Sequence, residues 1–255
     1  MQKDITITKV RIEYENHAYR TPLKFGGIIT DKVTLLNTYI CVKDRDGNEA
    51  EGFGSMPMGN VWSFPTKLHT YDETLAAMKG LAEMIRTISE DYNDYGHPIA
   101  IFHELEPKCF DAADRVTKAC ELREPIPKLC TLVVASPFDA AIHDAYGKLL
   151  GMNVFSTYGQ EFMNHDLSYY LDENFANEYL DQYVSKEPKP SMPLYHLVGA
   201  VDPITEADIK ERVNDGMPET LPEWIEQDGL THLKIKLNGD NLEWDVNRVV
   251  TIDRV

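Results

Sequence analysis

The sequence lacks the cysteine pattern that marks a disulfide framework or a zinc site. Its four cysteines, Cys41, Cys109, Cys120 and Cys130, are widely spaced and form no C-x-x-C pair. Isolated cysteines of this kind usually stay reduced inside cells and pack as small apolar residues. We therefore expect reduced, mostly buried thiols in a cytoplasmic protein.

Long apolar runs and an excess of basic residues are missing as well. No apolar run approaches the ~20 residues of a membrane span, and residues 1–6 lack the apolar core of a signal peptide. The formal net charge of the 255 residues is −17, whereas nucleic acids and anionic membranes attract basic surfaces. We therefore expect neither as a partner. The 43% of hydrophobic and 26% of charged residues are typical of a globular protein with a sizeable core.

The first 60 residues favour β-structure. Alternating apolar residues from Ile5, a β-rich run at 33–42 and an Asp-Gly signal at 46–47 predict a three-stranded antiparallel meander. Residues 21–31, between the first two strands, predict a Pro- and Gly-bearing loop too long for a hairpin turn. A second loop at 55–65 is rich in methionine and aromatic residues, which we expect to cover another surface.

From about residue 70 the apolar pattern becomes helical. Amphipathic spacing predicts a helix at 71–89. Further helices are expected at 99–105, 110–122 and 137–149, the last of them ended by Gly151.

A different order of predicted elements begins after the Pro-rich stretch 186–193. Strands are expected at 194–199 and 232–237, and helices at 205–214, 221–227 and 244–255. Strands that alternate with helices predict parallel pairing through crossover helices. Two strands do not complete a parallel α/β domain, so we expect the chain to be truncated within it.

Two lysines stand in the second of these strands. Side chains of a strand alternate between its faces, so Lys234 and Lys236 share one face and Ile235 points to the other. Two ammonium groups side by side repel each other and lose hydration, and both effects favour a neutral amine. A neutral lysine can act as a general base and remove a proton from carbon. The alternative is an edge strand whose solvated lysines oppose aggregation.

Four parts of the sequence carry a resemblance to a known family. They are the loop at 20–27, the strand and G-x-G at 47–54, the helix at 135–154, and the K-x-K at 234–236. The helix is the most specific part, because residues 139–148 follow the pattern D-x-A-x-x-D-x-x-G-K. In this order and spacing, the four parts resemble the enolase superfamily, in its mandelate racemase and muconate-lactonizing branch.

The resemblance implies a fold and a domain division. The fold class is an α+β capping domain, with a three-stranded antiparallel sheet and helices, followed by the first βα units of a TIM-type (β/α) barrel. The capping domain would cover residues 1–155, a bridging segment 156–192, and the beginning of the barrel 193–255.

The resemblance also implies site residues and a cofactor. Members of the family remove the proton α to a carboxylate and stabilise the enediolate with a divalent metal, usually Mg²⁺. By position, Lys236 would be the base and Lys234 its partner beside the substrate carboxylate. Candidate substrate-binding residues are Phe25, Met56, Met58, Trp62 and His196. The metal ligands would come from later barrel strands, beyond residue 255.

The resemblance implies an enzyme of the lyase or isomerase type. We expect an acid-sugar dehydratase; the alternatives are a racemase, epimerase or cycloisomerase of a small carboxylate, or a non-catalytic binding relative of the fold. The expected partners are a small carboxylate substrate and, in the assembly, further copies of the same chain.

Overall fold

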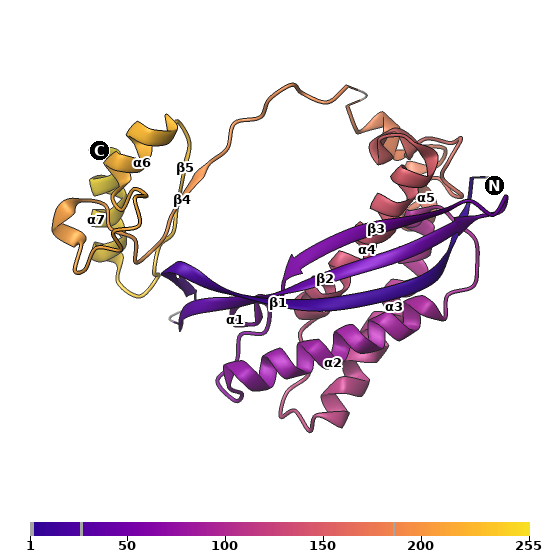
Figure 1. The fold of residues 1–255 in the computed structure, drawn as a ribbon, viewed down its shortest axis with the longest axis horizontal. Coiled ribbons are helices and arrows are strands. Elements are labelled where there is room, and N and C mark those ends of the chain that lie inside the picture. The colour runs from indigo at the N-terminus through magenta and orange to yellow at the C-terminus, as the bar shows by residue number, and fades with distance from the viewer. Residues whose placement is uncertain (1–2, 26–27, 186) are drawn as a thin grey trace. The chain divides into compact units, whose positions relative to one another are not determined.

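The chain folds into two compact units. The computed structural model describes residues 3–25, 28–185 and 187–255 (Figure 1). Unit 1 comprises Met1–His17 and Val33–Pro188, and unit 2 comprises Ala18–Lys32 and Lys189–Val255. Unit 2 is therefore built from two separate stretches of the sequence.

The predicted three-stranded sheet is confirmed. Its strands are β1 (Ile5–Phe25), β2 (Ile28–Asp44) and β3 (Glu49–Pro57), and their order in the sheet is β1-β2-β3. β2 and β3 pair antiparallel, with Thr38 opposite Gly54. Buried residues alternate along β2 with more exposed ones, as expected for a sheet that covers a core on one side.

The long loop predicted at 21–31 is wrong for the residues that the structure describes. β1 continues to Phe25, and β2 begins at Ile28. Most of the residues expected in a loop therefore belong to the two strands. β1 lies at an edge of the sheet, where a proline such as Pro22 is tolerated because one side of the strand needs no ladder hydrogen bond.

Three long helices pack in unit 1. They are α2 (Tyr71–Glu90), α3 (Pro98–Ala119) and α4 (Lys128–Leu150), preceded by the single turn α1 (Asn60–Ser63). α2 confirms the helix predicted from its amphipathic pattern, and a capping box between Thr70 and Glu73 begins it. Gly151 ends α4 in the left-handed conformation, as predicted.

Two helix boundaries expected from the sequence are wrong, and both errors lie at prolines. α3 is one helix rather than two, and it contains Pro107; α4 begins nine residues before Pro137. A proline removes one helical hydrogen bond, but buried residues on both sides hold each helix against the core. In α3 these are Leu105 and Cys109.

β3 lies directly on the backbone of α4. A Cβ atom at Gly54 would come within 2.0 Å of the Pro137 carbonyl oxygen, and one at Gly52 within 2.0 Å of that of Ala141. No side chain fits at these distances, so glycine is required for the sheet and the helix to approach this closely. Tyr146 and Phe138 of α4 are among the largest fully buried side chains of the core.

Short turns follow α4 in unit 1. They are η1 (Val154–Thr157), α5 (Leu167–Tyr170), η2 (Glu173–Phe175) and η3 (Leu180–Gln182). None of the helices in the described ranges is both long and apolar enough to cross a membrane.

Unit 2 contains the predicted pair of parallel strands. Its elements are β4 (His196–Val198), η4 (Glu206–Asp208), α6 (Leu221–Asp228), β5 (Leu233–Ile235) and α7 (Leu242–Asp253). β4 and β5 pair in parallel, with Leu197 opposite Lys234. A small core joins the strands to both helices through Val198, Leu221 and Ile252.

The helix predicted at 205–214 is wrong, because only η4 forms there. The Asp208 carboxylate accepts hydrogen bonds from the backbone of Ile204 and Thr205, which closes a single turn. Asn214 then adopts the left-handed conformation, with φ of 55°, and Arg212 pairs with Glu206. Local polar contacts thus replace the helical ladder in this acidic stretch.

Candidate functional site

The two faces of the β4–β5 pair differ in character. Leu233 and Ile235 pack with Val198 against the small core of unit 2. Because side chains alternate and paired residues of a parallel sheet share a face, Leu197 and Lys234 lie on the opposite face. The structure therefore places Lys234 away from the helices. Lys236 comes directly after β5, and its position on the same face stays a prediction from the spacing.

The pairing continues beyond the ends of both strands. His196 N donates to the His232 carbonyl oxygen at 2.9 Å, and Lys236 N donates to that of Val198, also at 2.9 Å. Lys236 is therefore held in the ladder by its backbone. Lys236 is half-buried, whereas Lys234 is exposed.

Lys234 contacts a tyrosine that comes directly before the neighbouring strand. Its Nζ lies 3.5 Å from the Tyr195 hydroxyl oxygen and 5.1 Å from the centre of the Tyr195 ring. Tyr195 comes two residues before Leu197, so it occupies the same face of the strand pair as Lys234.

The turn after Lys236 is built by a carboxylate of α7. Asp245 accepts hydrogen bonds from the backbone of Asn238 at 2.9 Å and of Gly239 at 3.0 Å. Gly239 has φ of 71°. Asp240 pairs with Lys24 of β1 at 3.3 Å, so the far end of the first hairpin contacts the loop at the carboxyl end of β5.

His196 lies on the other face from the lysines. Its register partner is Leu233, and its ring packs against Trp224 of α6 with 5.3 Å between ring centres. The sequence pattern predicts that this histidine binds substrate, but the structure brings it together with α6 and not with Lys234.

The remaining predicted substrate-binding residues come from the first three strands and the turn after them. Met58 has 1% of its surface exposed and belongs to the core of unit 1, and Met56 packs against that core. Trp62 is 37% exposed and covers Gly59. Phe25 ends β1, beside the Gly26-Gly27 pair that lies outside the described residues. Of the two methionines and Trp62, Trp62 has the surface most open to a ligand.

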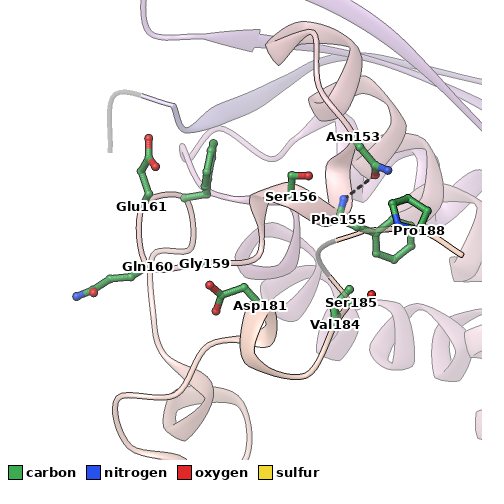
Figure 2. A pocket seen from close by; sticks show the side chains of 11 residues that line it. Asn153, Phe155, Ser156, Gly159, Gln160, Glu161, Asp181, Val184, Ser185 and Pro188 are labelled. Atoms are coloured by element: carbon green, nitrogen blue, oxygen red, sulfur yellow. Dashed lines mark hydrogen bonds between the residues drawn. The ribbon is translucent and has the colours of Figure 1, made fainter.

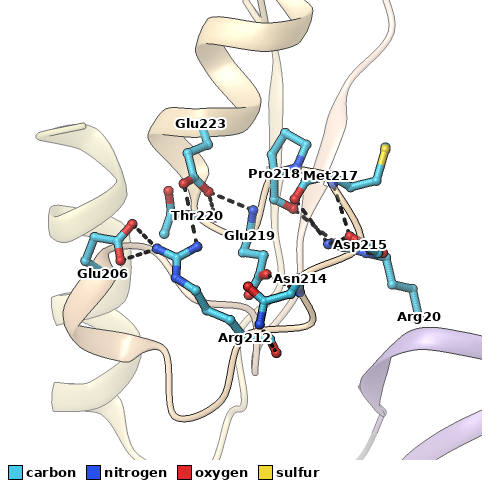
Figure 3. A network of polar contacts seen from close by, with 10 residues as sticks. All are labelled: Arg20, Glu206, Arg212, Asn214, Asp215, Met217, Pro218, Glu219, Thr220 and Glu223. Atoms are coloured by element: carbon cyan, nitrogen blue, oxygen red, sulfur yellow. Dashed lines mark hydrogen bonds and ion pairs between the residues drawn. The ribbon is translucent and has the colours of Figure 1, made fainter.

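Arg20 of β1 belongs to a polar network in unit 2 that no sequence pattern predicts (Figure 3). Its Nε and Nη2 donate to the two Asp215 carboxylate oxygens at 2.6 and 2.8 Å, and its Nη1 donates to the Pro218 carbonyl oxygen at 3.0 Å. The hydrogen bonds from Arg20 lower the pKa of Asp215 to about 2. This forked contact holds the hairpin end within unit 2.

Unit 1 contains a separate cavity of about 650 Å³ that none of the predicted site residues line (Figure 2). Phe155 and Phe162 contribute apolar surface, and Glu161 and Asp181 contribute carboxylates. Glu161 pairs with Lys3, whose ammonium also lies 3.9 Å from the centre of the Phe162 ring.

The family-like helix pattern in α4 has a structural role. Asp144 accepts a hydrogen bond from Phe53 N at 2.8 Å and pairs with Lys148 at 2.7 Å. Lys148 also donates to the Glu51 carbonyl oxygen. These contacts satisfy backbone groups on the outer edge of β3. Asp144 and Lys148 therefore attach the sheet to α4.

His97, the N-cap residue of α3, is fully buried beside His143 of α4. Its Nδ1 accepts a hydrogen bond from Ile99 N, and its Nε2 faces the Thr157 hydroxyl at 3.3 Å. That hydroxyl donates to the Val154 carbonyl oxygen, so His97 Nε2 carries the proton. Burial lowers the pKa of His97 to about 3, and His143 contributes a smaller effect in the same direction.

The pKa of His143 changes in the opposite direction. Burial alone would lower its pKa, but hydrogen bonds and the charge of Asp139 together raise it. The Asp139 carbonyl oxygen lies 3.0 Å from His143 Nδ1, and its carboxylate lies 3.2 Å away.

The described residues do not fit a divalent metal site. In residues 3–25, 28–185 and 187–255, no group of three or more histidine, cysteine, aspartate or glutamate side chains is arranged to hold a metal ion. All four cysteines are free: Cys109 and Cys130 are buried, Cys41 is half-buried and Cys120 is exposed.

Comparison with solved structures identifies the fold. The chain is similar to a dipeptide epimerase from Methylococcus capsulatus complexed with Mg and the dipeptide L-Arg-D-Lys, with 17% identity and a TM-score of 0.54. It is similar to an L-Ala-D/L-Glu epimerase from Bacillus subtilis, with 12% identity and a TM-score of 0.54. An L-talarate/galactarate dehydratase from Salmonella typhimurium LT2 gives 15% identity and a TM-score of 0.52.

These likenesses define the class of fold. Each covers 98% of this chain, but only 48–50% of the solved chain. The chain thus spans about half the length of the structures it matches. No family model and no curated protein matches the sequence.

The chain therefore shares its fold, a three-stranded antiparallel sheet with helices followed by a pair of parallel strands, with about half of each of these enzymes. This is the fold class that the sequence motifs predicted. The solved proteins with this fold include both epimerases and a dehydratase.

Proposed function

We propose that this chain belongs to an enzyme that removes the proton α to a carboxylate. The observation that supports this most directly is that Leu233 and Ile235 pack in the small core of unit 2, which leaves Lys234 on the opposite face of the β4–β5 pair. Alternation along the strand predicts the same face for Lys236. In a (β/α) barrel that face is the interior, and active sites lie at the carboxyl ends of its strands. Lys236 is the nearer of the two lysines to that end.

The two lysines have different roles in this proposal. The neutral amine of Lys236 takes the α-proton, the C–H bond breaks, and its electron pair moves into the carboxylate to give an enediolate. The ammonium of Lys234 stabilises the negative charge that develops there. Substrate binding by Trp62, Phe25 and Met56 stays a prediction from the sequence, whereas Met58 is buried in the core of unit 1.

Mg²⁺ is part of the proposal, with ligands outside residues 1–255. It would supply charge stabilisation for a carboxylate that becomes an enediolate. The described residues do not fit such a site, so the reaction steps assigned to this chain are those of the two lysines alone.

Dehydration of an acid sugar is the reaction that we propose first. The enediolate would expel the β-hydroxyl, which leaves as water after it receives a proton from an acid group not assigned to this chain. The product would be a 2-keto acid. The second candidate is epimerisation or racemisation, which the likeness to two epimerases favours; the enediolate is then reprotonated at carbon. We expect the whole protein to be a homo-oligomer that binds a small carboxylate.

The test is deuterium exchange at the α-carbon with the full-length protein. A panel of acid sugars and dipeptides is incubated in D₂O with Mg²⁺, and the α-proton signal is followed by NMR. Lys236→Met should abolish exchange, whereas Lys210→Met, an exposed lysine of unit 2, should not affect it.

The outcomes separate the alternatives. Exchange with formation of a 2-keto acid supports the dehydratase, and exchange without it supports the epimerase or racemase. No exchange on any substrate would support a non-catalytic relative. Undiminished exchange in Lys236→Met would refute the assigned base.

A further inference from the structure

We infer that Asp245 and Arg248 of α7 are positioning residues for Lys236. The inference rests on the proposed function for the role of Lys236 in the reaction. Its structural basis is a set of hydrogen bonds by which one helix holds the two loops that follow β4 and β5, at the carboxyl ends of both strands.

Asp245 fixes the chain just after Lys236. Its two carboxylate oxygens accept hydrogen bonds from Asn238 N at 2.9 Å and from Gly239 N at 3.0 Å. Lys236 N itself donates to the Val198 carbonyl oxygen at 2.9 Å. The Lys236 backbone therefore begins at one bonded amide and is followed, after a single residue, by the next.

Arg248 fixes the strand to which Lys236 is bonded. Its Nη2 donates to the carbonyl oxygens of Gly199, directly after Val198, and of Asp202, the latter at 2.9 Å. The Asp202 carboxylate accepts a hydrogen bond from Gly199 N at 2.6 Å, which closes the same turn. Because Arg248 is half-buried, its bonds are partly shielded from competing water. The carbonyl that binds Lys236 thus lies next to a fixed turn.

The two side chains are not required to begin or to bury α7. Asn241 caps the helix by accepting a hydrogen bond from Trp244 N at 3.0 Å, and Ile252 packs in the small core of unit 2. Asp245 and Arg248 direct their hydrogen bonds to the loops instead. Since they are three residues apart, they lie on the same side of α7. One rigid helix therefore sets the positions of both loops.

The placement of the Lys236 backbone matters for proton removal. A lysine side chain is long and flexible, so the position of its amine depends on where the backbone is held. A catalytic group that is misplaced by ~1 Å can lose about 100-fold in rate. The contacts of Asp245 and Arg248 act on the backbone, so they apply whichever charge the Lys236 side chain carries and whatever that side chain contacts.

Amide hydrogen exchange in the full-length protein tests the positioning without requiring turnover. Wild type is compared with Asp245→Ala, which removes both acceptor oxygens, and with Asp245→Asn, which keeps one. The matched control is Asp253→Ala, because Asp253 is an exposed carboxylate at the last residue of the same helix.

We expect a local change around Lys236. In Asp245→Ala, exchange at Lys236 and at the two loop amides should become about tenfold faster, whereas the middle of α7 should keep its protection. Asp245→Asn should have a smaller effect, and Asp253→Ala none. Faster exchange at Asn238 and Gly239 alone would overturn the inference, because Asp245 would then hold the loop without positioning the lysine. So would faster exchange throughout α7, which is the pattern of an unfolded helix.

Arg248→Met tests the other loop. This variant removes both hydrogen bonds to the turn after β4 but keeps an apolar side chain of similar reach. Exchange at the Gly199 and Lys236 amides should become about tenfold faster, because the turn and the neighbouring Val198 carbonyl are no longer held. Unchanged exchange at Lys236 would overturn the role assigned to Arg248.

A second measurement connects the inference to catalysis and separates the two proposals. If the enzyme exchanges α-protons of a substrate, Asp245→Ala should lower kcat about 10- to 100-fold and leave KM within about twofold, because a displaced base slows proton removal without weakening substrate binding. A higher KM with unchanged kcat would overturn the assigned role. If the full-length protein exchanges no α-proton at all, the proposed function fails, whereas amide exchange still decides whether α7 holds the Lys236 backbone.

Discussion

Buried His97 predicts a specific loss of stability in mild acid. An unfolded histidine has a pKa of 6.5, and burial lowers that of His97 to about 3. Between these values the unfolded chain binds a proton that the folded protein does not. Acidification therefore favours unfolding, and the stability present above pH 6.5 is lost as the pH falls.

The size of the loss follows from the two pKa values. At about pH 7.5 both states are mostly neutral at this position. At about pH 5.0 the unfolded histidine is protonated in about 97% of molecules and the folded one in about 1%, which corresponds to a loss of about 2 kcal/mol. His143 acts in the opposite direction, because its pKa is raised by Asp139. A comparison with a variant is therefore needed to isolate His97.

The assay is urea unfolding at about pH 7.5 and about pH 5.0 for wild type and His97→Asn. Asparagine can keep the cap, because its side-chain oxygen can accept the hydrogen bond from Ile99 N, but it does not titrate. The variant should lose about 2 kcal/mol less than wild type between the two pH values, whatever its stability at the higher pH. His103→Gln, on the exposed side of α3, should behave like wild type. An equal pH effect in wild type and His97→Asn would refute the reasoning.

Three further predictions concern contacts within each unit. Gly54→Ala should destabilise unit 1 by about 3 kcal/mol in thermal unfolding, since its Cβ would meet a backbone oxygen at 2.0 Å; Gly80→Ala, where the nearest atom is 3.7 Å away, should be neutral or slightly stabilising. Asp144→Ala should cost about 1–2 kcal/mol in the same assay, because it leaves an edge N–H of β3 without its acceptor, and Asp144→Asn should cost less. Arg20→Met should speed amide hydrogen exchange at residues 18–24 by about tenfold through loss of its charge-assisted bonds to Asp215; unchanged protection would show that these bonds do not hold the hairpin end.

The spacing of apolar residues correctly predicted those helices and strands that bury only one face. α2 has a single apolar face and a capping box, so its predicted and observed limits agree within one residue. The parallel pairing of β4 and β5 was likewise predictable from the alternation of strands and helices. The prolines of α3 and α4 misled the prediction, because packing on both sides of Pro107 and Pro137 outweighs one lost hydrogen bond.

The candidate site was predictable only in part. Alternation alone assigns Lys234 and Lys236 to one face, and the structure places Lys234 on the face opposite to the small core of unit 2. The contact of Lys234 with Tyr195 was not predictable, because it depends on the register of two strands 39 positions apart. The strand alone suggests that His196 belongs to the site, but register and the Trp224 ring place it on the helical face.

The discontinuity of unit 2 limits how this protein can be divided or recombined. A gene fragment beginning at residue 189 would encode the strands and helices of unit 2 without residues 18–32, which carry Arg20 and Lys24. Deleting that hairpin end from the chain would in turn require a new connection between β1 and β2. No single cut yields two complete modules, so insertions and fusions are better placed at exposed turns inside one unit, such as Asp46-Gly47.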